Sequence, residues 1–450
     1  MQREAIRLLK VSVLTGLFAA SVAQAELVRN PTQVGGSFDV GQIVDGTLYQ
    51  GSSYYGPVEK QVITRTGVYL TESGVYNDRL TIQLTIGGLF WFALPETESF
   101  QTRRIQFGPG VGQAQGVYVF GEDTKKPVAS LQFGLFPYKY SEAVNLGEYL
   151  YRSGTYPGTL VSGGWSYINA AGYLAQGVRI NVPLLDCKLS NDITLFMERD
   201  LEPANDLSPG YVASYKPVPF FEVGAGVVWA HALSLNSKRL SRHDDANKYS
   251  KSTGRPALGS DTALVNPCRD GVQSDCGYWT FKGFKTMARA SIDAGMLLGV
   301  DAIKAGDLKL YVETALLGVE DQPYYYEKKS ERMPVMVGVN LPTFGMLDRL
   351  AFEAEYQKTA FPNNNSSVLS KQIPIPVGDN QAFNYDPNKA TAHVKWTAYF
   401  RRQVSAGVSL YGQAASDHLR HFDFTATPGA VPTTRSASDW YYVLRLEFGI

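Results

Sequence analysis

Cysteine and histidine are scarce in this sequence, and their scarcity argues against several kinds of chemistry. Only 3 cysteines and 5 histidines occur among the 450 residues. A structural zinc site needs four ligands, and neither a second Cys pair nor a nearby His accompanies Cys268 and Cys276. His418 and His421 lie three residues apart in a strand-rich region, where this spacing puts them on opposite faces. We therefore expect no enzyme, no metal ion and no other cofactor.

Long apolar runs and an excess of one charge are also missing. Beyond the N-terminal segment no stretch approaches 18 consecutive apolar residues, which argues against a membrane-spanning helix. Lysine and arginine together number 42, as do aspartate and glutamate. A nucleic-acid partner needs a basic face, so this balance excludes one from our expectations.

The first 25 residues have the layout of a secretory signal peptide. Arg3, Arg7 and Lys10 precede an apolar stretch, and Ala23-Gln24-Ala25 supplies an A-x-A cleavage site. A single anchor helix is the alternative, but the apolar stretch is shorter than the ~20 residues that a span needs. No linker or shift in composition divides the rest. We therefore expect residues 1–25 to be removed and residues 26–450 to form one domain.

Aromatic residues and glycine are plentiful instead, and many segments alternate between apolar and polar side chains. The chain has 27 tyrosines and 43 glycines, a composition that favours strands joined by tight turns. In "RLTIQLTIGGLF" (79–90) the apolar residues fall on one face and the threonines and glutamine on the other. Such alternation predicts a half-buried antiparallel sheet, either in a soluble sandwich or in a membrane barrel.

Three features favour the barrel. The alternating runs are about 10 residues long, as a tilted strand needs to cross a bilayer, whereas strands in soluble proteins are nearer five or six. Tight turns contrast with two long polar stretches, near 234–279 and 359–389. Aromatic clusters such as "FWF" (90–92) and "DWYY" (439–442) fit interfacial girdles. We therefore predict an all-β transmembrane antiparallel barrel with short periplasmic turns and long extracellular loops.

The number of strands is expected to be about 16, and any even number from 14 to 18 is compatible with the pattern. The candidate strands lie near 36–49, 60–72, 78–92, 102–120, 127–140, 159–168, 171–184, 190–203, 217–233, 280–298, 307–318, 333–341, 348–358, 390–403, 404–417 and 437–449.

Two segments carry a resemblance to a known family. The final "DWYYVLRLEFGI" places apolar residues at alternate positions back from the last residue, Ile450. After the fifth candidate strand, "NLGEYLYRSGTYPG" (145–158) has a helical pattern in which Asn145 and Glu148 match a capping box. Together these segments resemble bacterial outer-membrane porins, in which a loop after the fifth strand folds into the barrel. The departure from that family is Ile450, where phenylalanine is commonest.

The resemblance implies a bacterial outer-membrane location, insertion by the barrel-insertion machinery through the C-terminal strand, and contact with outer-membrane lipid. Trimerisation is common in that family, and we keep a homotrimer as a candidate assembly. The resemblance also implies a constriction with acidic groups on the inserted loop facing basic groups on the wall. The candidates on the loop are Glu142, Glu148 and Arg152. An exposed turn on the outer rim is the alternative position for this helical segment.

The polar faces of the predicted strands supply the candidates that line the lumen. They are Arg179, Arg289, Lys309, Glu313, Arg349, Glu353, Glu355, Lys395 and Arg401. An exposed charge in a wide pore keeps its hydration and sets a transverse field. The alternative is that these charges pair across strands and stiffen the wall, with Asp293 and Glu447 as additional acidic partners.

We accordingly expect a porin that lets small polar solutes diffuse with weak charge selectivity, because the lumen charges are mixed. A structural or adhesive surface barrel with a closed lumen, which binds partners through its long loops, is the alternative. Cys268 and Cys276 bracket a polar loop and are predicted to form a disulfide in an oxidising compartment, which would stiffen such a loop. Cys187 is expected to be buried or to face the wall. A barrel enzyme using His393 is a third, weaker possibility.

Overall fold

A computed structural model describes the chain over most of its strands. The described residues are 27–50, 53–94, 104–138, 164–165, 173–197, 206–230, 232–234, 248–250, 276–278, 283–316, 319, 329–359, 391–416, 430–433 and 438–450. The strands make one large antiparallel sheet and a separate two-stranded ribbon. No helix in these ranges is long and apolar enough to cross a membrane.

Sixteen strands form a closed ring, in which each strand pairs with its neighbour along the chain and the last pairs with the first. Their bounds are β2 Gln33–Gln50, β3 Ser53–Tyr76, β4 Leu80–Leu94, β5 Arg104–Phe120, β6 Ala129–Pro137, β8 Tyr173–Leu184, β9 Leu189–Met197, β10 Asp206–Val218, β11 Phe221–Ala230, β15 Gly283–Asp293, β16 Lys309–Leu316, β17 Val335–Asn340, β18 Arg349–Thr359, β19 Thr391–Ser405, β20 Val408–Ala415 and β22 Trp440–Gly449. The seam is the antiparallel pair β2–β22. A closed ring leaves no unpaired edge, which is the requirement for a sheet that spans a bilayer.

The described chain also contains short strands and helical turns outside this ring. They are β1 Leu27–Arg29, β7 Gly164–Trp165, β12 Leu233–Ser234, β13 Lys248–Ser250, β14 Cys276–Tyr278 and β21 Ala430–Thr433, with the helix α2 Ala294–Leu298 and the 3₁₀ turn η6 Lys329–Arg332. Strand β1 extends the line of β2 by pairing with the end of β3. Backbone hydrogen bonds in both directions between Val34 and Ile450 tie the start of β2 to the last residue.

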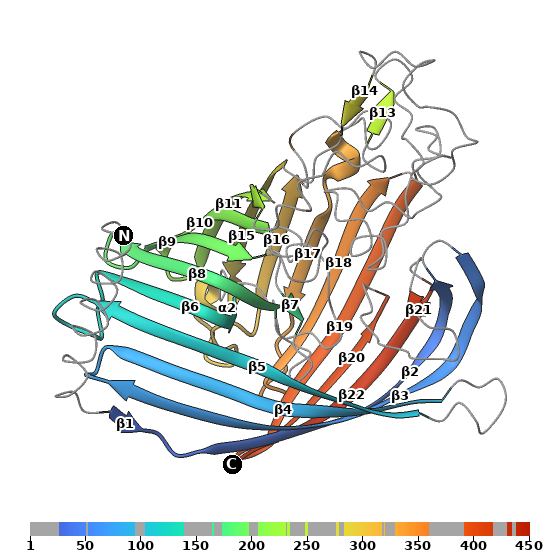
Figure 1. Cartoon of the computed structure of the whole chain (residues 1–450), viewed down its shortest axis with the longest axis horizontal. Coiled ribbons are helices and arrows are strands. Elements are labelled where there is room, and N and C mark those ends of the chain that lie inside the picture. The colour runs from blue at the N-terminus through green and yellow to red at the C-terminus, as the bar shows by residue number, and fades with distance from the viewer. Residues whose placement is uncertain are drawn as a thin grey trace, which may run out of the picture.

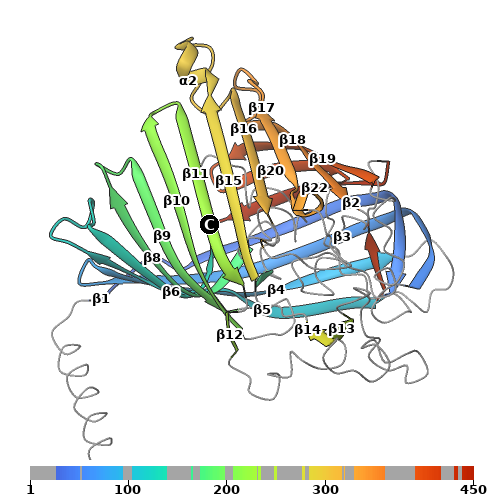
Figure 2. The same ribbon diagram turned by 90° about the horizontal axis from the view of Figure 1, so that it is seen from above.

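The two ends of the barrel differ in the length of their connections (Figures 1 and 2). At one end the strands are joined by residues 77–79, 121–128, 185–188, 219–220, 294–308, 341–348 and 406–407. At the other end the connections are 51–52, 95–103, 138–172, 198–205, 231–282, 317–334, 360–390 and 416–439, and four of them exceed 20 residues, which none at the first end does. Helix α2 lies at the short-turn end and the β13–β14 ribbon at the opposite one. The predicted contrast between short turns and long loops is therefore confirmed.

The sequence explains the tight ends. Asn77 and Asp78 occupy the left-handed region between β3 and β4, which Asn and Asp tolerate better than other non-glycine residues. Asp293, expected to face the lumen as an acidic partner, instead caps α2. Its carboxylate accepts hydrogen bonds from the backbone nitrogens of Met296 (3.1 Å) and Gly306 (2.7 Å). Gly299 ends the helix in the left-handed conformation.

The predicted strand number is confirmed, but one strand was missed. No candidate strand covered residues 206–216, a segment in which Pro209 is unfavourable for a strand. They form most of β10, in which Pro209 pairs with Leu195 of β9 and the pairing with β11 begins only at Gly210. Of the candidate strand 159–168, only the two-residue β7 falls within the described residues.

Candidate functional site

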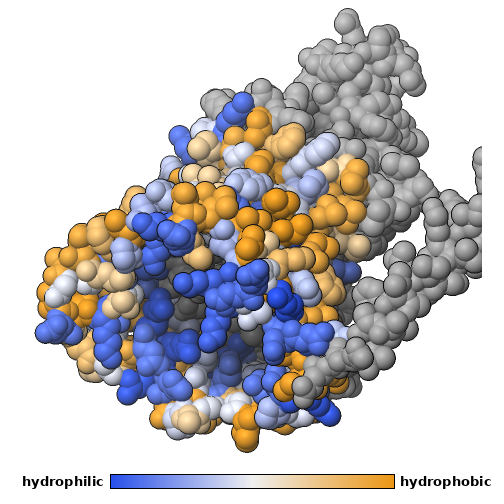
Figure 3. All heavy atoms as spheres, turned by 90° about the vertical axis from the view of Figure 1, so that its left-hand side faces the viewer, coloured by the Kyte–Doolittle hydropathy of each residue, from blue (hydrophilic) through white to orange (hydrophobic). Residues whose placement is uncertain are grey.

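Along most strands of the ring, side chains alternate between the inside and the outside of the barrel. The outward face is apolar: Phe38 and Leu446, for example, are 47% and 43% exposed. Hydrophilic residues gather around a hollow at the short-turn end, whereas the hydrophobic residues face outward (Figure 3). This division between an apolar exterior and a polar lumen is the arrangement of a transmembrane barrel with a hydrophilic interior. The lumen is therefore the candidate functional site.

An ion pair closes the seam of the barrel on its lumen side. Asp39 of β2 and Arg445 of β22 are register partners, and the guanidinium binds the carboxylate through two hydrogen bonds, Nε–Oδ1 at 2.6 Å and Nη2–Oδ2 at 2.9 Å. Both side chains are almost fully buried. A bidentate pair of this kind fixes the two strands in register as well as neutralising both charges.

A second arginine lies flat against the wall between β11 and β15. Arg289 makes an ion pair with Glu222 (2.8 Å) and donates a hydrogen bond to the Ser214 hydroxyl. Its register partner on β11 is Gly224, where a Cβ would come within 2.5 Å of the Arg289 Nε. The glycine therefore makes room for the guanidinium to reach β10 and the Glu222 carboxylate.

A glycine likewise makes room for a large side chain that reaches across β16, β17 and β18. The Tyr311 ring crosses Gly338 of β17, and its hydroxyl donates to Glu353 of β18 at 2.6 Å. A Cβ on Gly338 would lie 2.1 Å from Cζ of Tyr311. Next along β18, Glu355 faces Lys395 of β19 as its register partner, and both are buried. Cross-strand partners thus surround the acidic residues of this wall.

Two arginines lie opposite each other near the short-turn end. Arg349 of β18 and Arg401 of β19 are register partners. The guanidinium of Arg401 lies over the Tyr411 ring, 5.7 Å from its centroid, as in a cation–π contact. Tyr411 is in turn the register partner of Arg445 on β22. The aromatic ring therefore separates the arginine pair from the ion pair at the seam.

The Arg179 side chain on β8 contacts a carboxylate on one side and a neutral amide on the other. On one side it binds Asp192 of β9, with Nε–Oδ1 and Nη2–Oδ1 distances of 2.9 Å. Asp192 also accepts hydrogen bonds from the Tyr138 hydroxyl (3.0 Å) and the Asn181 amide (2.8 Å). On the other side, Arg179 donates to Gln132 of β6 (3.2 Å). Three donors thus hold the Asp192 carboxylate, and Arg179 neutralises its charge.

From Gln132 a row of side-chain amides continues around the lumen. Gln132 donates to Gln115 at 2.6 Å, and Gln115 and Gln113 donate to the same oxygen of Gln83 at 3.3 and 3.4 Å. These four side chains are half-buried. The wall from β4 to β6 therefore carries neutral hydrogen-bonding groups, in contrast to the charged wall formed by β15 to β22.

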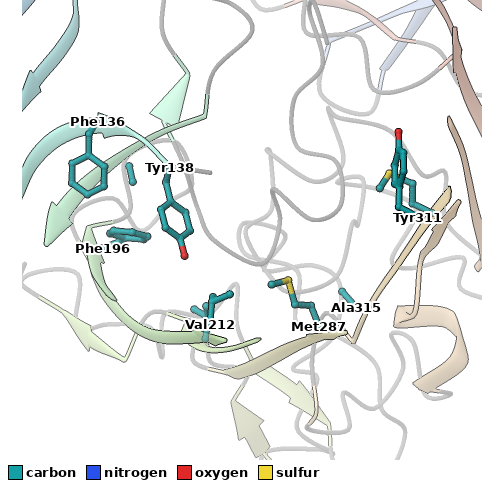
Figure 4. Close-up of a cluster of buried hydrophobic side chains, with 10 residues drawn as sticks. Phe136, Tyr138, Phe196, Val212, Met287, Tyr311 and Ala315 are labelled. Carbon is teal, nitrogen blue, oxygen red and sulfur yellow. The ribbon is translucent and has the colours of Figure 1, made fainter. Parts of the chain in front are cut away.

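Another lumen-facing set is apolar and shielded from solvent. It comprises Phe136, Tyr138, Ala175, Phe196, Val212, Val228, Met287, Tyr311, Ala315 and Met336, each at most 5% exposed. The rings of Phe136 and Tyr138 pack edge-on against Phe196, with centroids 6.0 and 5.2 Å apart (Figure 4). We call this set the apolar belt; apart from Tyr138, it lies on strands from β6 to β17.

All nine residues predicted to line the lumen lie within strands of the ring. The strands bring to the inner face Arg179, Arg289, Lys309, Glu313, Arg349, Glu353, Glu355, Lys395 and Arg401. Arg179 and Arg289 each form an ion pair with an acidic residue of the wall, as in the alternative of cross-strand pairing. Arg289 and Glu313 are register partners, and so are Glu355 and Lys395.

The predicted loop residues and the cysteines have different positions. Glu142, Glu148 and Arg152 lie outside the described residues, and so does Cys268. Cys276 begins β14, opposite Ser250, so the disulfide stays a prediction. Cys187 was expected to be buried or to face the wall, and this is wrong. It is exposed in the β8–β9 turn, where it adopts the left-handed conformation.

Asp39, Asp192 and Glu222 are not among the residues predicted from the sequence. Each forms its ion pair with a residue that is distant in sequence or offset across strands, so only the strand register reveals the partner. Among the described residues no group of three or more His, Cys, Asp or Glu side chains is placed to hold a metal ion.

Comparisons with known proteins find similarity only at the level of structure. No family model and no curated sequence matches the chain. A triple mutant of the Rhodopseudomonas blastica porin is 9% identical, covers 93% of this chain and 100% of its own, and has a TM-score of 0.41. A structure described as "Asymmetric conductivity of engineered proteins" is 8% identical, covers 95% of this chain and 100% of its own, and has a TM-score of 0.41. These scores are too low to assign a family, so the fold assignment rests on the strand pairing.

Proposed function

We propose that this protein is an outer-membrane diffusion porin that passes small polar solutes with weak charge selectivity. The observation that carries the proposal is the closed ring of sixteen strands with an apolar outer face and a polar inner face. A barrel of this size leaves an aqueous lumen unless something fills it. Weak selectivity follows from the pairing of lumen charges, since opposite charges within a few ångströms leave little net field at a distance.

The proposal includes export and insertion. Residues 1–25 would direct the chain out of the cytoplasm and be cleaved, and the apolar alternation of β22 would be recognised by the barrel-insertion machinery. Support comes from the position of β22, which pairs with β20 and closes the ring on β2. Contact with outer-membrane lipid is part of the same proposal, and a homotrimer remains a candidate assembly.

The proposal also includes a constriction by the segment between β6 and β8. Glu142, Glu148 and Arg152 would narrow the lumen and add charge there. Support comes from the point where this segment leaves the wall, because Tyr138 already binds Asp192 and packs on Phe196 in the lumen. The chain rejoins the wall in β8, where Ala175 belongs to the apolar belt.

Single-channel conductance of the refolded mature protein in a planar bilayer tests the proposal. Stable open steps are expected, with a reversal potential close to zero in a KCl gradient. Heat-modifiable migration in gels is the control for folding, since a closed barrel unfolds only on heating. A folded barrel without conductance steps would refute the porin function.

A closed surface barrel that binds partners through its long loops is the second candidate. The observation that favours it is the apolar belt, which faces the lumen and is nevertheless at most 5% exposed. Apolar side chains shielded in this way are typical of a packed interior. Conductance separates the two candidates, because a filled lumen carries no ionic current.

A further inference from the structure

We propose that the amide row of β4 to β6 is a binding track for neutral polyhydroxylated solutes, such as sugar alcohols and small sugars. This inference rests on the proposed function, because it requires an open lumen. It goes further by naming a substrate class and the side chains that select it. The track consists of Gln83, Gln113, Gln115 and Gln132.

The chemistry of the track matches hydroxyl groups better than ions. A hydroxyl both donates and accepts hydrogen bonds, and a side-chain amide offers two donors and an acceptor without net charge. The neighbouring wall positions also carry neutral hydrogen-bonding groups, since the Thr71 and Thr85 hydroxyls are 2.9 Å apart across β3 and β4. A charged solute gains more from the arginines and carboxylates of the other wall.

The hydrogen bonds within the track leave groups open to a solute. In the described part of the chain the Gln83 side-chain nitrogen donates no hydrogen bond, and the Gln113 side-chain oxygen accepts none. The bonds that Gln113 and Gln115 make to Gln83 are long, at 3.4 and 3.3 Å, so they are weak. A solute hydroxyl can therefore replace them at small cost.

The row also has a direction. Arg179 donates to Gln132, Gln132 to Gln115, and Gln115 to Gln83, so every donor points the same way along the wall. Successive hydrogen bonds polarise one another, and the cation at the start increases the effect. The Gln132 and Gln115 amides, nearest the cation, are therefore the most strongly polarised groups of the row.

Flux measurements in proteoliposomes test the track. Mannitol is the probe, and triethylene glycol is the comparison solute, since it is flexible and has few hydroxyls. In the native protein mannitol flux should saturate with concentration, whereas triethylene glycol flux should rise linearly. Gln83→Leu with Gln113→Leu should raise the mannitol half-saturation concentration about fivefold for each hydrogen bond lost. The single-channel conductance in KCl should remain within about a factor of two, as the lost groups are neutral.

Gln413→Leu is the matched control. Gln413 also faces the lumen, but its amide is buried and donates to the Tyr441 hydroxyl at 2.9 Å, so a solute does not reach it. Gln113→Leu alone is the milder variant, because it removes only the 3.4 Å bond. Linear mannitol flux in the native protein, or saturation unchanged in the leucine variants, would overturn the track while the conductance steps still support a pore. Absence of conductance would instead refute the porin function itself.

Discussion

Asp39 and Arg445 lie 406 positions apart in the chain, yet they form a two-bond ion pair across the seam of the barrel. Their register pairing is the point at which the first strand of the ring meets the last. Both side chains are removed from solvent, at 0% and 2% exposure. The pair therefore links closure of the sheet to neutralisation of two buried charges, so ring closure and charge pairing depend on each other.

Replacing Asp39 by Asn should destabilise the folded barrel by about 3–5 kcal/mol, because the buried Arg445 guanidinium loses the carboxylate that binds it through two hydrogen bonds. The measurement is the urea concentration at which heat-modifiable migration is lost in lipid vesicles. Arg29→Gln is the control, since Arg29 pairs with Glu72 at a site where its side chain is 70% exposed. Surface pairs contribute about 0–1 kcal/mol, so equal losses in the two variants would contradict this account of the seam.

Replacing Gly338 by Ala should destabilise the barrel by about 1–3 kcal/mol through overpacking, because the new Cβ would meet the Tyr311 ring. The loss should shrink when Tyr311 is also replaced by Ala, as a double-mutant cycle measures directly. Gly449→Ala is the matched glycine control, because nothing lies within 4 Å of a Cβ at that position. Additive effects of the two substitutions at 338 and 311 would exclude the proposed clash.

The direction of the side chains is the feature that the sequence predicts best. In β22 the alternation assigned Tyr442, Leu444 and Leu446 to one face and Tyr441 and Val443 to the other. The first group is 38–43% exposed and the second is fully buried. A period of two fixes this division once a strand is recognised, since slipping by one residue would exchange the two faces.

The partners of the lumen charges are not predictable in the same way. Arg179 meets Asp192 of the next strand and Gln132 of the previous one, and each contact depends on the stagger between strands. That stagger is a property of the closed ring, and no local pattern of residues specifies it. Alternation therefore identified Arg179 as a lumen residue, but it left the choice between pore lining and wall pairing open.

Charge substitutions should separate the two faces of the barrel. Phe352→Lys puts a cation on the outward face, where Phe352 is 43% exposed. It should lower the free energy of unfolding of the barrel by about 2–4 kcal/mol if the position lies near the bilayer centre. Ser130→Lys places the same charge on the inner face of β6, where water hydrates it. Folding yield in lipid vesicles is the measurement. A larger loss for Ser130→Lys than for Phe352→Lys would reverse the assignment of inside and outside.

Replacing Arg179 by Gln should shift the selectivity of an open pore toward cations. The substitution leaves Asp192 with only the neutral donors Tyr138 and Asn181, so one negative charge in the lumen becomes uncompensated. The reversal potential in a KCl gradient is the measurement, with a several-fold rise in the potassium-to-chloride permeability ratio expected. Arg402→Gln is the control, because Arg402 bonds to the backbone of Gly345 at the short-turn end and its contact with Asp348 is long (3.9 Å) and solvent-exposed. Equal shifts in both variants would mean that net charge rather than the Asp192 pairing is responsible.

Deleting residues 145–154 should raise the single-channel conductance if the segment between β6 and β8 forms the constriction. Belt residues Tyr138 and Ala175 flank this segment, so if the segment packs on the belt its removal should also expose Phe136 and Phe196 to water. Conductance therefore measures the opening of the lumen, and binding of a hydrophobic fluorescent dye measures the exposure of the apolar belt. A deletion of equal length within 360–390, which joins β18 and β19 at the same end, is the control. If that control raises the conductance as much, or if neither readout moves, the constriction must be assigned to another part of the chain.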